Sequence, residues 1–350
     1  MIEDELRATF ARHEQLVPAA GPVRSAIDRL VVRRRRRRLA IRTTGAALAV
    51  LVAAGVPVVG RQLTTAPPVG PAPAGSAPAD GPLNVLILGA EGSAASGYRA
   101  DSVIVAHLPR GRDRVFLVAL PRDLWVADIP GSGAGKLNTV LMAGGRAGGG
   151  PDLAAGARLA ARTVTGVTGV PIDGTAVLTF AGLRNVTDAV GGVPVCLPQT
   201  VRSRHTDRRF PAGCQRLDGR AALDLLRQRY DLPDGGMDRD RNAQRFAAGL
   251  LHQVTGTDLH SDPIRLAALV RAAGAGLVVD GLSMSELLAL LPGLGRAEPV
   301  GIGWRLSDTR DENGGLRLDP AVSRSLFDAI RGDAVAGWAA THRRNVTDLD

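Results

Sequence analysis

The chain has 350 residues, a formal net charge of +9 and 45% apolar residues, enough for one large or two medium domains with a buried core. Aromatic residues make up only 3% of the sequence, so there is little surface for stacking nucleic-acid bases. Most of the excess charge lies in one run of six arginines, residues 33–38. A nucleic-acid footprint over a whole surface is therefore not supported, and we expect no nucleic-acid partner.

An uncharged apolar segment follows the arginine run. Residues 43–60 carry no charged side chain, and this length just suffices to cross a hydrocarbon core of about 30 Å. The alternatives are a nuclear-localisation-type patch or a secretory signal peptide, but the charged region before the segment is too long for a signal peptide. Arginines beside one end of an apolar span place that end in the cytoplasm. We therefore expect a cytoplasmic basic segment over 1–38 and a single-pass transmembrane anchor over 39–60 in the cell membrane.

The chain beyond the anchor is expected to lie outside the cytoplasm. Residues 61–82 read RQLTTAPPVGPAPAGSAPADGP, a Pro/Ala/Gly linker that cannot bury a core. One globular domain is predicted over 83–332, where strand-like and helix-like segments follow one another. Residues 333–350 are expected to form a loose polar tail. The charged segment before the arginines is either a small docking or regulatory element or an amphipathic lead-in.

Charged residues stand beside the first three apolar runs of the domain. These runs, 85–88, 103–106 and 115–120, are each short enough to be a buried strand. The charged residues are Glu91, Arg99, Asp101, Arg122 and Asp123. Any one of them alone is more simply explained as an ordinary turn residue. Together, carboxylates and arginines around strand ends are the pattern of a metal–phosphate site.

The next segments are read from their turn and capping residues. GSGAGK, residues 131–136, approaches a phosphate-binding loop, but Leu137 stands where that motif requires Ser or Thr, and its first glycine is missing. A nucleotide-binding loop is therefore rejected. Asp152 is an N-cap for a helix that runs to about residue 164. PIDGTAVLTF is then typical of a strand, and AGLRNVTDAV of a helix.

Two cysteines, Cys196 and Cys214, lie beyond the predicted anchor. A disulfide between them is chemically allowed outside the cytoplasm, and the alternative is two buried free thiols. The predicted topology favours the disulfide, whose short loop would stabilise the fold by about 3 kcal/mol.

Arginines also gather around a predicted helix in the second half of the domain. Asp218 can cap this helix, which ends at about residue 226. Arg227 and Arg229 follow it. In an extended segment both side chains point to the same side, whereas in a continuing helix they diverge by about 200°. A loop, DLPDGGMD, leads into another helix with Arg241 near its start. The alternative is that these arginines are ordinary solvated surface residues.

The available side chains indicate phosphate chemistry. There is no GxSxG nucleophile motif, and the six histidines show no metal-ligand spacing. What remains is two carboxylates, Glu91 and Asp101, among several arginines. Mg²⁺, or Mn²⁺ in its place, is usually held by one or two carboxylates with phosphate oxygens and waters, and arginine forks bind phosphate in a bidentate way. The sequence therefore predicts a Mg²⁺–pyrophosphate site outside the membrane.

The order of the motifs LGAE, RADS, VALPRD, GKLN, DAVGGVPV, LDGRAALDLLRQRY and DRDRNAQRF resembles the LytR-CpsA-Psr (LCP) family of cell-wall phosphotransferases. The resemblance covers roughly residues 83–254. It implies an α/β fold, a three-layer α/β/α sandwich around a mixed sheet, with a deep apolar pocket for a polyprenyl chain. It also implies transfer of a glycopolymer from a polyprenyl-pyrophosphate carrier to peptidoglycan, which releases polyprenyl phosphate, with pyrophosphatase as a side activity.

The resemblance assigns roles to the charged residues as well. It implies that Glu91 and Asp101 hold the metal. The residues that it implies for binding the pyrophosphate and the head group are Arg122, Arg227, Arg229, Lys136 and Arg241. Arg99 would lie beside the reacting phosphate, and Asp123 would orient the arginines or assist proton transfer.

The chain departs from the family pattern in three places. Glu91 stands where the family usually has Asp, and the spacer before Arg99 is short. The usual Arg-Gln-Gln run is replaced by Gln244, Arg245 and Phe246, so no role is transferred to those positions. The alternative function is therefore a non-catalytic binder or sensor of polyprenyl pyrophosphate that signals through the cytoplasmic segment. A DNA-binding regulator that uses the arginine run is a weaker hypothesis, because membrane topology already explains that run.

Overall fold

The computed structural model describes residues 81–93, 95–147, 152–230, 232–256, 262–295, 297–304 and 314–349. The predicted cytoplasmic segment, the predicted anchor and nearly all of the predicted linker lie outside these residues. Within the described part, no helix has the length and apolar character needed to cross a membrane.

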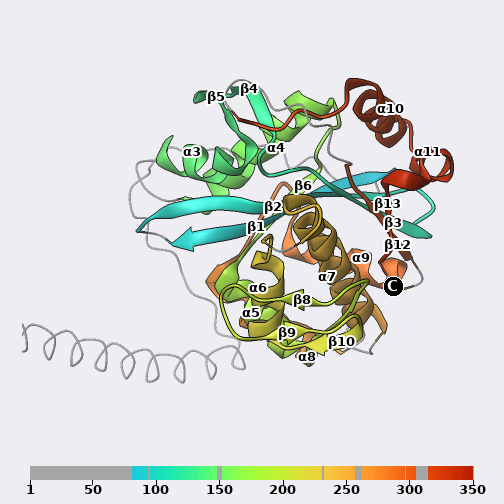
Figure 1. Ribbon diagram of the computed structural model, residues 1–350. Helices are drawn as coiled ribbons and strands as arrows, with labels where there is room; N and C mark the ends of the chain where they lie inside the picture. The colour runs from blue at the N-terminus through green and yellow to red at the C-terminus, as the bar shows by residue number, and fades with distance from the viewer. Residues whose placement is uncertain are drawn as a thin grey trace, which may run out of the picture. The chain divides into compact units, whose positions relative to one another are not determined.

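A mixed sheet forms the centre of the domain (Figure 1), and seven strands of the described residues build it in the order β11–β6–β1–β2–β3–β12–β13. The strands are β1 (Leu83–Ser93), β2 (Gly97–Leu108), β3 (Arg114–Ala119), β6 (Gly174–Thr179), β11 (Leu277–Asp280), β12 (Glu298–Ile302) and β13 (Val346–Thr347). The first three form an antiparallel meander. β6 joins β1, and β12 joins β3, in parallel. The predicted mixed sheet is confirmed.

The strands of the meander are apolar on both sides because helices cover both faces of the sheet. Leu86 and Leu88 of β1 belong to the core on one face, together with α3, α4 and α10. Val85 and Ile87, which alternate with them, pack on the other face against α7 and α9. Such strands read as continuous hydrophobic runs instead of alternating ones. This explains why short apolar runs predict the meander correctly.

The helices divide between the two faces of the sheet, as Figure 1 shows with α3, α4 and α10 above it and α5 to α9 below. The first group is α3 (Val140–Ala147), α4 (Leu153–Thr168) and α10 (Pro320–Arg331). The second group is α5 (Phe180–Ala189), α6 (Gly219–Arg227), α7 (Gly236–Gly256), α8 (Pro263–Ala273) and α9 (Met284–Leu294). Both predicted caps form, since the Asp152 carboxylate accepts from two backbone amides of α4 and the Asp218 carboxylate from one of α6.

A small disulfide-linked ladder lies beside α7. It consists of β7 (Val193–Leu197) and β10 (Gly213–Leu217), and a short hairpin of β8 (Val201–Arg202) and β9 (Arg209–Phe210) lies between them in the chain. Cys196 and Cys214 are direct neighbours across the β7–β10 ladder and form a disulfide. The predicted disulfide is confirmed.

The segment that approaches a phosphate-binding loop forms a hairpin instead. β4 (Trp125–Ile129) and β5 (Gly133–Lys136) pair in antiparallel fashion, and the 3-10 turn η1 (Leu137–Thr139) leads from β5 into α3. Gly131 and Gly133 have φ values of 78° and 73°, which only glycine adopts readily. The glycines therefore allow the backbone turn between β4 and β5.

The expected loose tail over 333–350 is wrong. Helix α11 (Val335–Thr341), the 3-10 turn η4 (Arg343–Asn345) and strand β13 follow Gly332. Val335, Trp338 and Ala339 are buried in the main core, and β13 pairs with β12. These three apolar residues have i, i+3, i+4 spacing, the pattern of one buried helix face, but the helix has only seven residues and most of its other positions are Ala or Gly, which leave the pattern weak.

Candidate functional site

A β-bulge presents the first acidic residue of the site. In the β1–β2 ladder Gly89 lies opposite Ser102 and Ala90 opposite Ala100, so Asp101 is the extra residue on β2. A bulge redirects the side chain that it carries, and here it brings Asp101 within hydrogen-bond reach of Glu91. Arg99 lies directly opposite Glu91 in the same ladder. The hairpin alone thus assembles three of the predicted residues.

The electrostatics of Glu91 reflect this close approach. Burial raises the pKa of Glu91, and the hydrogen bond and negative charge of Asp101 raise it further, whereas Arg227 and Arg122 oppose the shift. Two neighbouring carboxyl groups of this kind share a proton or a cation, because both are costly to ionise together. Glu91 and Asp101 are therefore candidate ligands for a divalent cation.

Arg122 connects the acidic pair to the end of β3. Its Nη1 donates to Asp101 Oδ1, and its Nε lies 3.7 Å from Asp123 Oδ2. Among buried side-chain nitrogens and oxygens of the described residues, two lack a hydrogen-bond partner, Arg122 Nε and Asn138 Oδ1. Buried polar atoms are nearly always satisfied. Both atoms belong to residues around Asp123, so the unmade hydrogen bonds of these buried side chains fall next to this carboxylate.

Asp123 has two further neighbours on the β5–η1 segment. Lys136 Nζ lies 4.0 Å from Asp123 Oδ1, and Asn138 Nδ2 donates to the same oxygen at 3.5 Å. The Asn138 backbone amide donates to the Arg122 carbonyl at 2.9 Å, which fixes η1 against the end of β3. Asp123 is thus placed to hold Arg122 and Lys136 in position, the orienting role predicted for it.

Arg227 and Arg229 reach the site from the end of α6. Arg227 is the last residue of the helix, and Gln228 has extended backbone angles, φ −70° and ψ 133°. Gln228 is 1% exposed, whereas both arginines are exposed. The pair therefore has the extended arrangement in which the two arginines share a side. Arg227 Nη2 lies 3.4 Å from Glu91 Oε1, and its guanidinium stacks over the Phe180 ring at 5.6 Å.

A buried polar network fixes this turn. Gln228 Nε2 donates to the carbonyl and to Oδ1 of Asp224, both at 2.8 Å, and to Ser203 Oγ at 3.1 Å. The Asp224 carboxylate also accepts from Ser203 Oγ at 2.7 Å and from Thr206 Oγ1 at 2.6 Å. Since Ser203 and Thr206 lie in the segment between β8 and β9, the disulfide-linked region supports the position of both arginines.

A cavity of about 330 Å³ opens between these parts of the site, and it includes residues that sequence reasoning missed. Its charged lining residues are Arg122, Asp123, Arg229, Asp234, Arg239 and Asp240. Arg239 and Asp240 form a buried ion pair with 2.9 Å between Nη2 and Oδ1. Burial raises the pKa of Asp240 to about 6, although Arg239 and Arg122 oppose this shift. The only signal for these residues in the sequence is the alternation DRDR at the start of a helix.

The neighbouring residues of α7 are engaged elsewhere. Arg241 Nη1 lies 2.6 Å from both Asp234 Oδ2 and Asp238 Oδ1, and Arg241 does not line the cavity. Its role at the head group therefore stays a prediction. Gln244 is buried and donates to the carbonyls of Leu117 and Ile302 at 2.7 and 2.6 Å. That side chain ties α7 to the sheet and is not available to a ligand.

The acidic residues permit Mg²⁺ but do not enclose it. Among the described residues, no group of three or more His, Cys, Asp or Glu side chains could hold a metal ion. A Mg²⁺ ion needs only one or two carboxylates when phosphate oxygens and waters complete its octahedron. Glu91 and Asp101 fit that requirement.

A mixed sheet covered by helices, with carboxylates at a hairpin bulge and arginines from separate elements beside them, defines an α/β protein with a charged candidate site at the ends of its strands. The chain belongs to the LytR_cpsA_psr family, whose family model matches residues 64–268.

Named relatives support this assignment. The cell wall biosynthesis protein LcpA of Corynebacterium glutamicum is 34% identical over 196 residues, which cover 51% of this chain and 38% of that protein. The polyisoprenyl-teichoic acid–peptidoglycan teichoic acid transferase TagU of Enterococcus faecalis is 34% identical over 178 residues, or 49% of this chain and 54% of that protein. The chain thus spans less than two thirds of the length of either relative.

Solved structures share the fold. Bacillus subtilis TagV superimposes with a TM-score of 0.58 at 20% identity, covering 73% of this chain and 98% of TagV. TagT bound to LI-WTA gives a TM-score of 0.55 at 18% identity, covering 73% of this chain and 91% of TagT.

Proposed function

We propose that this protein is a membrane-anchored phosphotransferase that moves a glycopolymer from a polyprenyl-pyrophosphate carrier to peptidoglycan outside the cytoplasm. The observation that carries the proposal is the gathering of arginines on two adjoining features. Arg122 and Arg227 contact the acidic pair, and Arg122, Arg229 and Arg239 line the neighbouring cavity. The relative TagU, a polyisoprenyl-teichoic acid–peptidoglycan teichoic acid transferase, supports the same type of reaction.

Phosphoryl transfer needs positioning and charge neutralisation more than covalent chemistry by the protein. Arg122 and Arg229 line the cavity and would bind the pyrophosphate oxygens through their guanidinium forks. Arg227, near Glu91, would hold the same group from the α6 side. Asp123, near Arg122 and Lys136, would keep both cations oriented and would accept the proton of an attacking hydroxyl.

Glu91 and Asp101 are the residues that would hold Mg²⁺ or Mn²⁺. The ion would neutralise charge on the pyrophosphate oxygens.

Apolar side chains on the α7/α9 face support the proposal that the polyprenyl chain binds there. Partly buried aliphatic residues between the sheet and the helices pack against the core there, namely Ile87, Leu226, Leu251, Leu287 and Leu290. Leu226 precedes Arg227 directly, so apolar and cationic side chains meet at the end of α6. A lipid pyrophosphate has the same order of groups, an apolar chain followed by a doubly charged head.

The test is transfer by the full-length protein in lipid nanodiscs, with a short-chain polyprenyl-pyrophosphoryl glycan as donor and peptidoglycan strands as acceptor. We expect Mg²⁺-dependent transfer, and we expect Arg227→Ala and Arg229→Ala to abolish it while the proteins stay folded. Arg220→Ala, which removes an exposed arginine at the other end of α6, is the matched control. Wild-type transfer by both test variants would contradict the proposal. Binding of the donor without any cleavage in the presence of Mg²⁺ would favour the sensor instead.

A further inference from the structure

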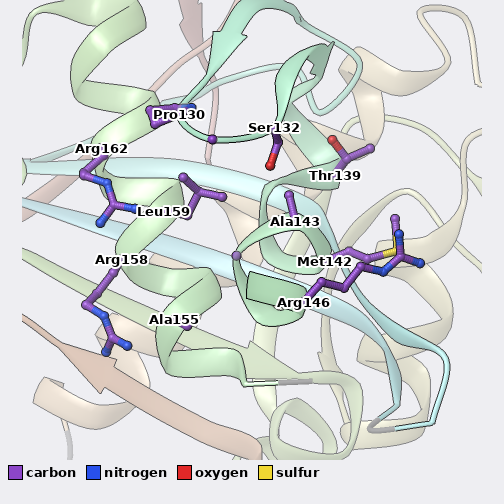
Figure 2. A pocket seen from close by; sticks show the side chains of 12 residues that line it. Pro130, Ser132, Thr139, Met142, Ala143, Arg146, Ala155, Arg158, Leu159 and Arg162 are labelled. Carbon is purple, nitrogen blue, oxygen red and sulfur yellow. The ribbon is translucent and has the colours of Figure 1, made fainter. Parts of the chain in front are cut away.

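A second cavity, about 820 Å³ in volume, lies on the α3/α4 side of the sheet (Figure 2). Ser132 of the β4–β5 turn and Thr139 of η1 bring hydroxyl groups to it. Arg146 comes from α3, and Arg158 and Arg162 come from α4 on the other side of the cavity. We call this cavity the arginine groove.

The groove carries positive charge that the described residues leave largely unbalanced. None of the described residues lining it is acidic. Arg146 and Arg162 are exposed and make no ion pair with the described residues, and Arg158, which is 49% exposed, has one partner, Asp280 at 3.2 Å. Guanidinium groups of this kind bind carboxylates through paired hydrogen bonds.

Two glycines hold the walls of the groove at a fixed separation. A Cβ atom on Gly144 of α3 would lie 2.7 Å from the Ala155 carbonyl oxygen, and one on Gly156 of α4 would lie 2.7 Å from the Leu141 carbonyl oxygen. The two helices therefore touch backbone to backbone, which any side chain at these positions would prevent. Arg146, Arg158 and Arg162 consequently lie on two helices that pack directly against each other.

The groove begins beside the candidate site. The Thr139 hydroxyl donates to the Lys136 carbonyl at 2.8 Å, so the lining residue and the site residue share one turn. Met142 packs next to Gly97, the first residue of β2, where an added Cβ would lie 3.3 Å from Met142 Cγ. The hairpin that carries Glu91, Arg99 and Asp101 thus contacts a lining residue of the groove at its turn.

The two faces of the sheet suit the two ends of a displacement reaction. The aliphatic residues suited to the lipid lie on the α7/α9 face, and the arginine groove lies on the opposite, α3/α4 face. In phosphoryl transfer the attacking and leaving oxygens lie roughly in line on opposite sides of the phosphorus. If polyprenyl phosphate leaves toward the α7/α9 face, the attacking hydroxyl arrives from the α3/α4 face.

We propose that the arginine groove binds the acceptor, a glycan strand that carries carboxylates, and presents its hydroxyl to the carrier-bound phosphate. The inference rests on the proposed function and adds where the acceptor lies and what recognises it. The hydroxyl oxygen forms the new bond to phosphorus, the bond from phosphorus to the lipid-phosphate oxygen breaks, and the hydroxyl proton is released to Asp123 or water. Arg146, Arg158 and Arg162 contact the carboxylates of the strand, away from the reacting atoms.

The test compares the triple variant Arg146→Gln/Arg158→Gln/Arg162→Gln with a control in which Arg184→Gln, Arg220→Gln and Arg271→Gln are combined. The control removes the same charge from exposed positions on α5, α6 and α8. The probe is a fluorescently labelled peptidoglycan strand, and its binding to the full-length protein is measured by anisotropy. We expect the test variant to weaken binding about tenfold, the size expected when three exposed ion pairs are lost. We expect the control to bind like the wild type.

Three further measurements separate the outcomes. The KM for the strand in the transfer assay should rise by the same factor, whereas cleavage of the donor by water should be unchanged. A strand whose carboxyl groups have been amidated should bind the wild type as weakly as the test variant binds the unmodified strand. Equal binding by wild type and test variant, or equal binding of both strands, would overturn the inference. Loss of affinity for the isolated donor glycopolymer in place of the strand would overturn it as well. Absence of transfer by the wild type would instead count against the proposed function, because strand binding is measured independently of turnover.

Discussion

Two parts of the molecule meet in the candidate site, and they are held in place by different forces. The strand half, Glu91, Asp101 and Arg122, lies on the β1–β2 hairpin and just after β3, where these partly exposed residues border the main apolar core. The helix half, Arg227, Arg229 and Arg239, lies at the end of α6 and the start of α7. Hydrogen bonds of Gln228 and Asp224 and the nearby disulfide-linked ladder hold part of it.

The two halves of the site hold closely spaced charges of both signs in a fixed arrangement. Apolar burial keeps the acidic pair close together despite the repulsion between its carboxylates. The helix half contributes cations that would repel one another without anionic partners, and Glu91 and Asp240 supply two of these partners. We expect changes in the strand half to act mainly on chemistry and changes in the helix half to act on both positioning and stability.

The largest effect is expected from Arg122→Ala in the strand half. The change removes the guanidinium between Asp101 and Asp123 and, with it, the Nε donor that has no hydrogen-bond partner among the described residues. Loss of one preorganised donor of this kind costs about 10²- to 10³-fold in kcat. Steady-state transfer assays measure this loss, with Arg122→Lys as the variant that keeps the charge but loses the fork. A kcat within about threefold of the wild type for Arg122→Ala would remove Arg122 from the proposed chemistry.

The second prediction concerns the pH dependence of stability through Asp240. Because burial raises the pKa of Asp240 to about 6, the folded protein keeps this proton at pH values where the unfolded chain has lost it. Stability from this group is therefore present at pH below about 4 and is lost as pH rises toward 6, by up to about 3 kcal/mol.

Urea unfolding of the wild type and of Asp240→Asn from pH 4 to 7 measures this contribution. The difference between their unfolding free energies should fall with rising pH and level off above the raised pKa. A difference that stays constant across the range would show that Arg239 keeps Asp240 ionised throughout.

The third prediction separates the two halves through Gln228→Leu. This residue is buried and donates to Asp224 and Ser203, so the change removes the side-chain donor to the Asp224 carbonyl and one of the donors to its carboxylate. We expect a loss of about 2 kcal/mol in unfolding free energy and a reduced affinity for the pyrophosphate-bearing donor. Binding of Mg²⁺ alone, followed by calorimetry, should not change, because the acidic pair belongs to the other half. Loss of Mg²⁺ binding would show that the halves are not independent.

The smallest effect is expected from Glu91→Asp, which installs the residue usual in the family. The contact of Glu91 with Arg227 at 3.4 Å joins two side chains that are 42% and 38% exposed. Its loss should cost less than about 1 kcal/mol of stability. Mg²⁺ affinity should change less than about tenfold, since Asp is an equally good oxygen ligand. A larger loss would mean that the ion needs the greater reach of Glu91.

Local patterns in the sequence were sufficient for much of the fold. The meander follows from three apolar runs, and the starts of α4 and α6 follow from Asp152 and Asp218 as caps. The disulfide follows from the topology and from having two cysteines. The C-terminal helix and strand were missed because they are short, seven and two residues, and because most other positions of the helix are Ala or Gly.

The site was predicted less completely than the fold. Neighbours across one hairpin, such as Glu91 and Arg99, can be recognised from the sequence, because strand pairing follows from the turn between them. Arg239 and Asp240 could not be recognised, because burial decides their importance and burial depends on how α7 packs. Gln244, to which the family pattern transfers no role, proves to link α7 to two strands through its side-chain amide.

The strand order has a consequence for how the domain reaches its final form. β1, β2 and β3 follow one another in the chain through short turns, whereas β6, β11, β12 and β13 join the central sheet after long intervening segments. Domains with many such distant pairings fold slowly, because the entropy cost of closing a long loop precedes the stabilising contacts of each pairing. The hairpin with its two carboxylates needs only local contacts, but the arginines of α6 and α7 depend on the later pairings. Quenched-flow hydrogen exchange should therefore find the β1–β2 amides protected before those of α7.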